Sequence, residues 1–401
     1  MQGESPLNMM RPRGQRSRQS SAAAPPRRRI WPVAAAIAAL VVLAAGWSVL
    51  WYYAAARADR TLSAWVEREA AAGRVYSCGS QGIGGFPFRI EVTCATAGAA
   101  INSNQPPFAV SAKDITFAAA LYHPTLLVGQ VTGPVTVALP GQSPSYIANW
   151  AQAQMSVGGL PPEPDSVAVT FDQPQLDHVA AAEPTRVFTA DHAEIRSRIV
   201  DGSPSNNPVI ETQVQFASAT APTLHALLAE PLQGDIDVVL RGFKDLAPKP
   251  WAARFREMQE AGGAIAIKRL RLERPDSIVV GSGTLTVNAD GKLDGVIQVA
   301  IAGLDEIVPQ LGIDRLIAHG IDRLAGTVGQ PTQGLNTLDR LMPGLSGVVR
   351  QSATSGVIDN LKKMGQPTEI DNKPAIVLPL RFSDGAVYLG IVPLGEVPPL
   401  F

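Results

Sequence analysis

The stretch YSCGSQGIGGFPFRIEVTC, residues 76–94, contains both cysteines of the 401-residue chain. In its second half, apolar residues alternate with charged or polar ones, a period of two that is typical of a half-buried β-strand. The alternating apolar residues are Phe88, Ile90, Val92 and Cys94. Residues 74–78 would be the antiparallel partner strand, and the glycines between the two segments would reverse the chain. The stretch therefore predicts a β-hairpin.

Glycines beside cysteines also allow three chemical interpretations. A dinucleotide-binding loop needs G-x-G-x-x-G between a strand and a helix, but Pro87 stands where the last glycine belongs and a strand follows. A redox pair normally has C-x-x-C spacing, which this stretch lacks. Two cysteines without a histidine pair do not make a zinc site. A structural role is therefore favoured.

Outside this hairpin, the clearest signal is a run from Ile30 to Ala56 with no charge and one polar residue, Ser48. A bilayer core needs about 20 apolar residues in a helix, and residues 31–51 cover about 30 Å at about 1.5 Å per residue. Tryptophan, which favours membrane interfaces, occurs at both ends, and two tyrosines follow it at the second end. The candidate membrane-anchor residues are Trp31, Trp47, Trp51, Tyr52 and Tyr53. We expect a single transmembrane helix at 30–56.

Charge on the two flanks predicts the orientation of this helix. Residues 1–29 are rich in arginine with one acid, whereas few charges follow the span. Because positive charge is retained in the cytoplasm, we expect a cytoplasmic N-terminus, an anchor in the inner membrane and a periplasmic remainder. The alternative is a signal peptide cleaved at Ala54-Ala55-Ala56, but signal peptides have shorter leaders and apolar stretches of about 7–15 residues.

Export has two consequences for chemistry. Thiols oxidise outside the cytoplasm, so two cysteines most simply form one disulfide, Cys78 to Cys94. Its loop of about 15 residues corresponds to about 3 kcal/mol in the chain-entropy model. Because the part after the basic tail is mildly acidic, nucleic acid is not an expected partner, whereas the lipid bilayer is.

The remaining pattern predicts an α+β fold: an N-terminal transmembrane helix followed by a mainly antiparallel, curved β-sheet module with packed helices. Short strand-like segments punctuated by proline and glycine support the sheet. Four parts are expected, namely a disordered basic cytoplasmic tail at 1–29, a transmembrane anchor at 30–56, a β-rich exported domain at 57–303, and a helical segment with a closing β-hairpin at 304–401.

Local signals place turns and helices within these parts. Asp-Gly dipeptides at 290–291 and 384–385 each separate two strand-like segments, as tight hairpin turns do. Helices are expected at 61–72, 145–155, 223–230 and 251–260, and repeated IDRL and LDRL motifs between 313 and 341 indicate amphipathic helical segments. In the 251–260 helix, Trp251, Phe255 and Met258 form a stripe that we interpret as packing on the sheet.

Four segments together resemble the bacterial envelope family catalogued as domain of unknown function 2125. They are GIGGFPFRIEVTC (82–94), YHPTLLVGQVTGP (122–134), GSGTLTVNADGKLDGVIQVAIAGL (281–304) and the ending GAVYLGIVPLGEVPPLF. The resemblance covers roughly residues 45–401 and implies a single anchored envelope module, with no reaction or catalytic residues to carry over. At the level of fold, the pattern of strand and hairpin segments is similar to that of envelope proteins whose long curved sheets hold lipid in an apolar groove.

Motifs for catalysis are weak in this sequence. The densest constellation is Asp191-His192-x-Glu194, where His192, Glu194 and Arg196 would share one strand face, and a solvated face is the favoured interpretation. Nucleophile-elbow and phosphate-loop motifs do not occur in the sequence. No cofactor and no catalytic or metal-binding residue is therefore predicted.

One basic cluster stands out after the tail. It comprises Lys268, Arg269, Arg271 and Arg274. These cations are candidates for contact with anionic lipid headgroups. A strand with Leu270 and Leu272 turned inward and a solvated charged face gives the same sequence, and that interpretation is preferred.

Three functional hypotheses follow from the sequence. The first is a non-catalytic, membrane-anchored periplasmic protein that binds lipid or another apolar ligand in a sheet-lined groove. The second is an envelope scaffold that binds other envelope proteins through exposed strands or the helical segment. The third, ranked last, is a hydrolase without a recognisable motif.

Overall fold

A computed structural model describes residues 31–104, 106–160, 163–179, 183–310, 356 and 358–401. The chain forms two compact units, Met1–Leu50 and Trp51–Phe401. The expected cytoplasmic tail at 1–29 and the repeated motifs between 313 and 341 lie outside the described residues.

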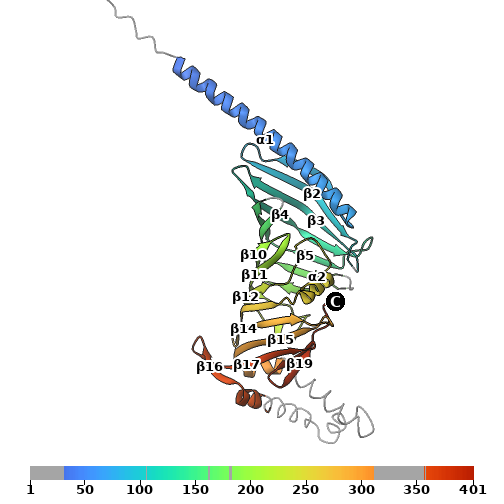
Figure 1. The fold of residues 1–401 in the computed structure, drawn as a ribbon, viewed down its shortest axis with the longest axis vertical. Coiled ribbons are helices and arrows are strands. Elements are labelled where there is room, and N and C mark those ends of the chain that lie inside the picture. Colours follow the sequence, from blue (N-terminus) through green and yellow to red (C-terminus); the bar gives the residue numbers. More distant parts are fainter. Residues whose placement is uncertain (1–30, 105, 161–162, 180–182, 311–355, 357) are drawn as a thin grey trace, which may run out of the picture. The chain divides into compact units, whose positions relative to one another are not determined.

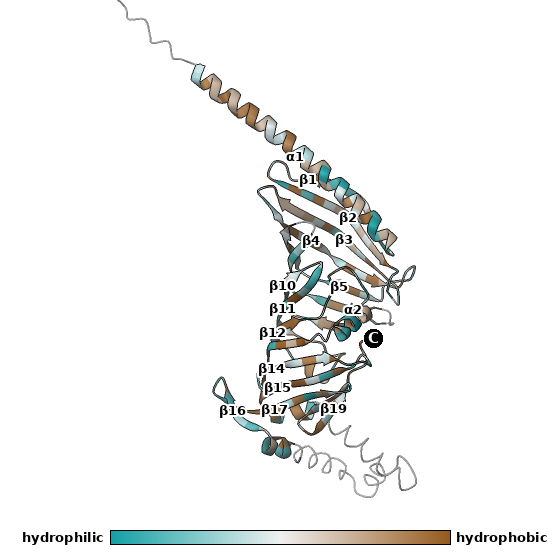
Figure 2. Cartoon of the chain, in the orientation of Figure 1, coloured by the Kyte–Doolittle hydropathy of each residue, from teal (hydrophilic) through white to brown (hydrophobic). Residues whose placement is uncertain are grey.

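Helix α1, Trp31–Ala71, contains the predicted anchor. It is long and apolar enough to cross a membrane, and Figure 2 shows hydrophobic colour along its first half. The same helix continues through the segment predicted at 61–72, so the helical character of both segments is confirmed. Its five candidate anchor residues lie between Trp31 and Tyr53. The orientation of the helix and the compartment of the sheet stay predictions.

The described residues of the second unit form one antiparallel sheet of 19 strands that does not close on itself (Figure 1). The first ten strands are β1 (Arg74–Gly84), β2 (Arg89–Ile101), β3 (Phe108–Ala120), β4 (His123–Ala138), β5 (Tyr146–Asn149), β6 (Gln152–Leu160), β7 (Glu163–Asp172), β8 (Gln175–His178), β9 (Thr185–Thr189) and β10 (His192–Ser203). The others are β11 (Asn206–Ala219), β12 (Leu232–Leu240), β13 (Ile265–Glu273), β14 (Ile278–Val287), β15 (Leu293–Ala302), β16 (Gln366–Ile370), β17 (Lys373–Ser383), β18 (Ala386–Leu389) and β19 (Val392–Glu396). The predicted α+β class is confirmed.

Most strands pair with the next strand along the chain. The main ladder runs β1, β2, β3, β4, β6, β7, β10, β11, β12, β13, β14, β15, β17, β18 and β19. Strands β5, β8 and β9 branch from β4, while β16 pairs with β17. This sequential pairing is what short turns between antiparallel strands produce.

The quoted hairpin forms as predicted. Strands β1 and β2 pair, and the disulfide joins Cys78 to Cys94 with their Cα atoms 5.7 Å apart. The two Asp-Gly hairpins are also confirmed, as β14–β15 and β17–β18. Gly291 and Gly385 occupy their turns with φ of 75° and 81°, the left-handed region that glycine adopts without strain.

Two of the predicted helices differ from the structure. Residues 145–155 form strands β5 and β6, not a helix, because Ala153, Met155 and Val157 alternate toward one face and pair with β7. Non-local pairing overrides the local helical pattern there. The segment 223–230 contains only a single 3₁₀ turn, η1 (Ala226–Leu228), whereas α2 (Trp251–Glu260) confirms the 251–260 helix.

The sheet has one apolar and one polar face. Residues directly opposite one another on neighbouring strands share a face, and one such row crosses thirteen strands without a polar side chain. This apolar row is Ile83, Val92, Phe117, Gly129, Met155, Val169, Ile195, Val214, Ile236, Leu270, Gly281, Val299 and Leu378. We call the side of the sheet that carries it the apolar face.

The opposite face carries the polar side chains. Residues next in sequence to members of the apolar row form a second paired row. This row is Thr93, Thr116, Gln130, Gln154, Thr170, Glu194, Gln215, Asp235 and Arg271. Because successive side chains on a strand point to opposite faces, the two rows lie on opposite sides of the same sheet.

In the part of the chain that the structure describes, helices cover the apolar face near β14–β19. Near β14–β19, helix α3 (Leu304–Gln310) and residues Ile358 and Leu361 pack on strand residues such as Val299 and Leu378 and form the main core. A smaller core joins Met258 of α2 with Phe243 and Val287. From β2 to β13, by contrast, most side chains of the apolar row are only half-buried, and Ile195 is 45 % exposed.

Candidate functional site

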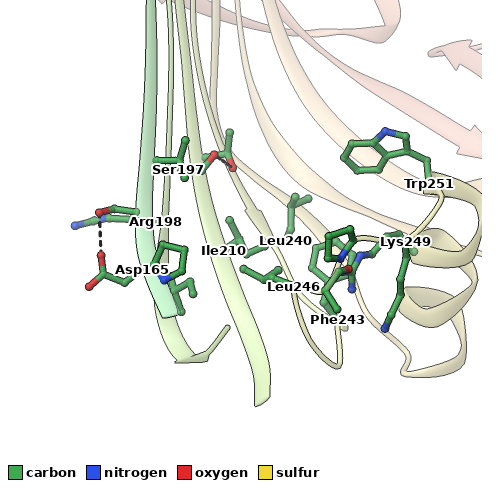
Figure 3. Close-up of a pocket in the computed structure, with 17 residues that line it drawn as sticks. Asp165, Ser197, Arg198, Ile210, Leu240, Phe243, Leu246, Lys249 and Trp251 are labelled. Atoms are coloured by element: carbon green, nitrogen blue, oxygen red, sulfur yellow. Dashed lines mark hydrogen bonds between the residues drawn. The ribbon is translucent and has the colours of Figure 1, made fainter. Parts of the chain in front are cut away.

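The apolar face is hollowed into a pocket of about 550 Å³ over strands β7, β10, β11 and β12. Strand residues such as Val167, Ile210 and Leu240 form one wall. The segment 243–251 and the start of α2 form the other wall, with Phe243, Leu246 and Trp251 turned toward the strands (Figure 3). This volume lies in the range of about 300–1,000 Å³ that is usual for small-ligand sites.

An ion-pair network holds the second wall in place. Lys249 Nζ lies 2.8 Å from Asp245 Oδ2 and 3.1 Å from Glu257 Oε2. Arg254 pairs with the same two carboxylates and donates to the backbone carbonyls of Asp245 and Ala247. The segment before α2 is thus tied to α2 itself, which fixes the position of the pocket wall.

The electrostatics of this network favour the charged forms of Asp245, Glu257 and Lys249. The hydrogen bond from Lys249 is the main cause that lowers the pKa of Asp245. Burial acts to raise the pKa of Glu257, but the hydrogen bonds from the Lys244 amide and from Lys249 together hold it below its ordinary value. The hydrogen bond to Asp245 raises the pKa of Lys249. The cations at the pocket are therefore already neutralised by partners.

The polar groups on the floor of the pocket are few and engaged. Ser197 Oγ and Thr212 Oγ1, which face each other across β10 and β11, are 3.0 Å apart and share a hydrogen bond. The pocket thus presents apolar surface and paired polar groups. Such a lining suits the binding of an apolar molecule better than the activation of a nucleophile.

A second cavity shares Trp251 with this pocket. Its volume is about 790 Å³, and it is lined by Phe108 of β3, Val137 of β4, Tyr146 of β5 and Trp251. Trp251, highly exposed, borders both cavities. The interpretation of Trp251 as a packing residue is therefore wrong, although Met258, fully buried, does pack on the sheet. Nothing in the helical spacing distinguishes these two residues, because both lie on the stripe.

The basic cluster predicted from the sequence lies on β13 and just after it, and each of its cations has an acidic partner. Lys268 pairs with Glu211 at 2.7 Å, Arg269 with Asp235 at 3.1 Å, Arg271 with Glu273 and Asp371 at 2.8 and 2.5 Å, and Arg274 with Glu230. Leu270 and Leu272 point to the apolar face, as predicted. Contact of these cations with lipid headgroups stays a prediction. Such contact would compete with the ion pairs that each cation already makes.

The histidine constellation is a surface ion-pair group. His192 Nδ1 lies 2.8 Å from Asp172 Oδ1, and Arg196 pairs with Glu194 at 2.7 Å. As expected, His192, Glu194 and Arg196 share one face of β10, the polar face, where they lie next to residues of β7. Among the described residues, no group of three or more His, Cys, Asp or Glu side chains could hold a metal ion.

No curated protein and no solved structure matches the chain. The model of the family described as "Uncharacterized protein conserved in bacteria" matches residues 51–398, which is most of the chain and the whole sheet. The chain therefore belongs to this bacterial family, domain of unknown function 2125.

Proposed function

We propose that this protein is a membrane-anchored lipid-binding protein that holds acyl chains against the apolar face of its sheet. The observation that carries the proposal is the apolar row, in which thirteen paired residues include no polar side chain. Contiguous exposed apolar surface is unfavourable in water, and large patches of it commonly mark binding sites.

The dimensions of the face suit extended hydrocarbon chains. Strands β2 to β12 contribute eight neighbouring members of the ladder, and seven spacings of about 4.8 Å make about 34 Å. This length is close to the roughly 30 Å hydrocarbon core of a bilayer, which is two acyl chains thick. The pocket below Trp251 lies within this interval.

The same chain also supplies a source of such molecules. Helix α1 is long and apolar enough to cross a membrane, so membrane lipid is the apolar molecule nearest to the sheet. The arginine-rich segment before the helix and the Cys78–Cys94 disulfide support a periplasmic location of the sheet and a cytoplasmic N-terminus. In this proposal, the protein sits in the inner membrane with a single pass.

The direct test is to purify the full chain in mild detergent and measure bound lipid by native mass spectrometry and by extraction. Lipid at a defined stoichiometry supports the proposal. Protein free of lipid, with partners retained after mild crosslinking, would instead support a scaffold.

The scaffold is the second candidate because one sheet edge is open. In the described part of the chain, β1 pairs with β2 on one side only, which leaves backbone groups available for an added strand. A crosslinked partner that maps to residues 74–84 would favour this function over lipid binding.

A further inference from the structure

Two turns at one end of strands β1–β4 carry exposed aromatic side chains. The β1–β2 turn contains Phe86 and Phe88, and the β3–β4 turn contains Tyr122. These side chains are 53 %, 62 % and 74 % exposed. The turns are neighbours, because the amide of Leu121 donates to the carbonyl of Phe88 at 2.9 Å. We call these three residues the aromatic cluster.

The aromatic cluster is tied to helix α1 at a defined residue. The indole N–H of Trp51 donates to the carbonyl of Arg89 at 2.7 Å, and Trp51 is almost fully buried. The ring of Phe86 lies 5.6 Å from the ring of Trp51 and 6.5 Å from that of Tyr52. The β1–β2 turn therefore lies at the same level along α1 as Trp51 and Tyr52.

That level is the end of the apolar run. Within α1, residues 31–51 extend about 30 Å, the thickness of a bilayer core, so a spanning α1 places Trp51 and Tyr52 at the membrane–water interface. Groups in direct contact with Trp51 must lie within a few ångströms of the same depth. The connection is local and does not depend on how the rest of the sheet is placed.

We infer that the aromatic cluster is a second membrane-contact element, which inserts into the interface of the bilayer that α1 crosses. This inference rests on α1 spanning the membrane and is independent of whether the apolar face binds lipid. Tyrosine is enriched at this interface because it combines apolar area with a polar hydroxyl, and Phe86 and Phe88 add apolar area beside Tyr122.

The polar groups beside the cluster fit the headgroup level. A cavity of about 420 Å³ is lined by Phe88 and Tyr122 together with His123, Gln130 and the ion pair of Arg89 with Glu91, whose atoms lie 2.7 Å apart. Aromatic rings next to an ion pair and hydrogen-bonding side chains match the mixed apolar and polar character of the membrane interface. Water, a second copy of the chain or another protein would be the alternative surroundings of the cluster.

The test uses the full chain with one introduced cysteine, reconstituted in liposomes of phosphatidylcholine and phosphatidylglycerol. Because both native cysteines are in the disulfide, Tyr122→Cys can be labelled selectively with an environment-sensitive fluorophore. Leu224→Cys is the matched control, since Leu224 is 69 % exposed in a different loop. Preserved disulfide and far-ultraviolet circular dichroism confirm that both variants fold.

We expect the label at 122 to emit at shorter wavelength than the label at 224. We also expect lipids with a spin label near the headgroup to quench it several-fold more strongly. Equal, water-like emission and quenching at both positions would overturn the inference. A blue shift at 122 without lipid quenching, and dependent on protein density, would assign the cluster to contact between copies and would overturn it as well.

Discussion

Replacing Ile195 with aspartate is the most direct perturbation of the proposed lipid site. Ile195 lies near the middle of the apolar row and is 45 % exposed, so the remaining exposed area is what a ligand would cover. Full burial of an isoleucine side chain is worth about 1.5–3 kcal/mol, which leaves about 1 kcal/mol for ligand contact. Loss of that contact alone corresponds to about a fivefold rise in Kd.

The carboxylate adds a larger effect. An acyl chain that covers an aspartate removes water from a charged group without offering a hydrogen bond, at a cost of several kcal/mol. The combined loss should exceed about 100-fold in affinity, because about 1.4 kcal/mol corresponds to a factor of ten. A ligand that avoids position 195 altogether would escape this cost.

A matched control separates the lipid site from general damage to the sheet. Val296 is 39 % exposed and lies on the polar face of β15, opposite Thr284 and Arg381. Both Ile195→Asp and Val296→Asp place aspartate in a strand at a similarly exposed position, so their effects on β-propensity should be similar.

The assay is displacement of a fluorescent fatty acid from the detergent-solubilised full chain, with bound lipid counted by native mass spectrometry. We expect Ile195→Asp to lose binding and Val296→Asp to retain it. Equal binding in both variants and the unmodified chain would refute lipid on the apolar face. Equal loss in both, with the fold intact, would show that binding does not depend on which face is changed and would refute it too.

Three further predictions test the anchor, the disulfide and the pocket wall. Reporter fusions at residue 25 and at the C-terminus should report cytoplasmic and periplasmic locations respectively, and cytoplasmic activity at the C-terminus would overturn the topology. Cys78→Ser should lower the free energy of unfolding by about 3 kcal/mol in denaturant titrations, and an unchanged midpoint would show that the disulfide adds no stability. Asp245 and Glu257 have lowered pKa values, so their unfolded forms take up protons first, and stability should fall as the pH drops below about 4.5, the ordinary glutamate value. Glu257→Gln should weaken this acid sensitivity in thermal melts, and an identical pH profile would contradict its role.

Local sequence patterns were sufficient for features whose cause is local. The apolar run of α1, the alternation before Cys94 and the two Asp-Gly turns each depend on residues within one or two elements. The helix expected at 145–155 failed for the opposite reason. Its strands β5 and β6 gain their hydrogen bonds from β4, β7 and β8, which a window of neighbouring residues cannot show.

The candidate site was less accessible to sequence reasoning, because it depends on register. A shift of one residue in any strand would exchange the two faces of that strand. The β12–β13 and β13–β14 pairings each contain a bulge near Lys268. These bulges keep Leu270 aligned with Ile236 and Gly281 on the apolar face. Alternation within a strand therefore predicts that one face of the strand is apolar. Only the pairing of the strands shows that the apolar faces of thirteen strands lie on the same side of the sheet.

Two glycine–phenylalanine pairs show how this coincidence shapes the floor of the apolar face. Phe117 lies opposite Gly129 in the ladder, and Phe216 lies opposite Gly234. A Cβ atom added at Gly129 would come within 2.8 Å of the Phe117 ring, and one added at Gly234 within 2.1 Å of the Phe216 ring. Each ring thus lies down over the bare backbone of the neighbouring strand instead of standing away from the sheet. A larger residue at either glycine would push the ring away from the sheet. These pairs therefore keep the rings close to the backbone and leave room above them for the proposed ligand.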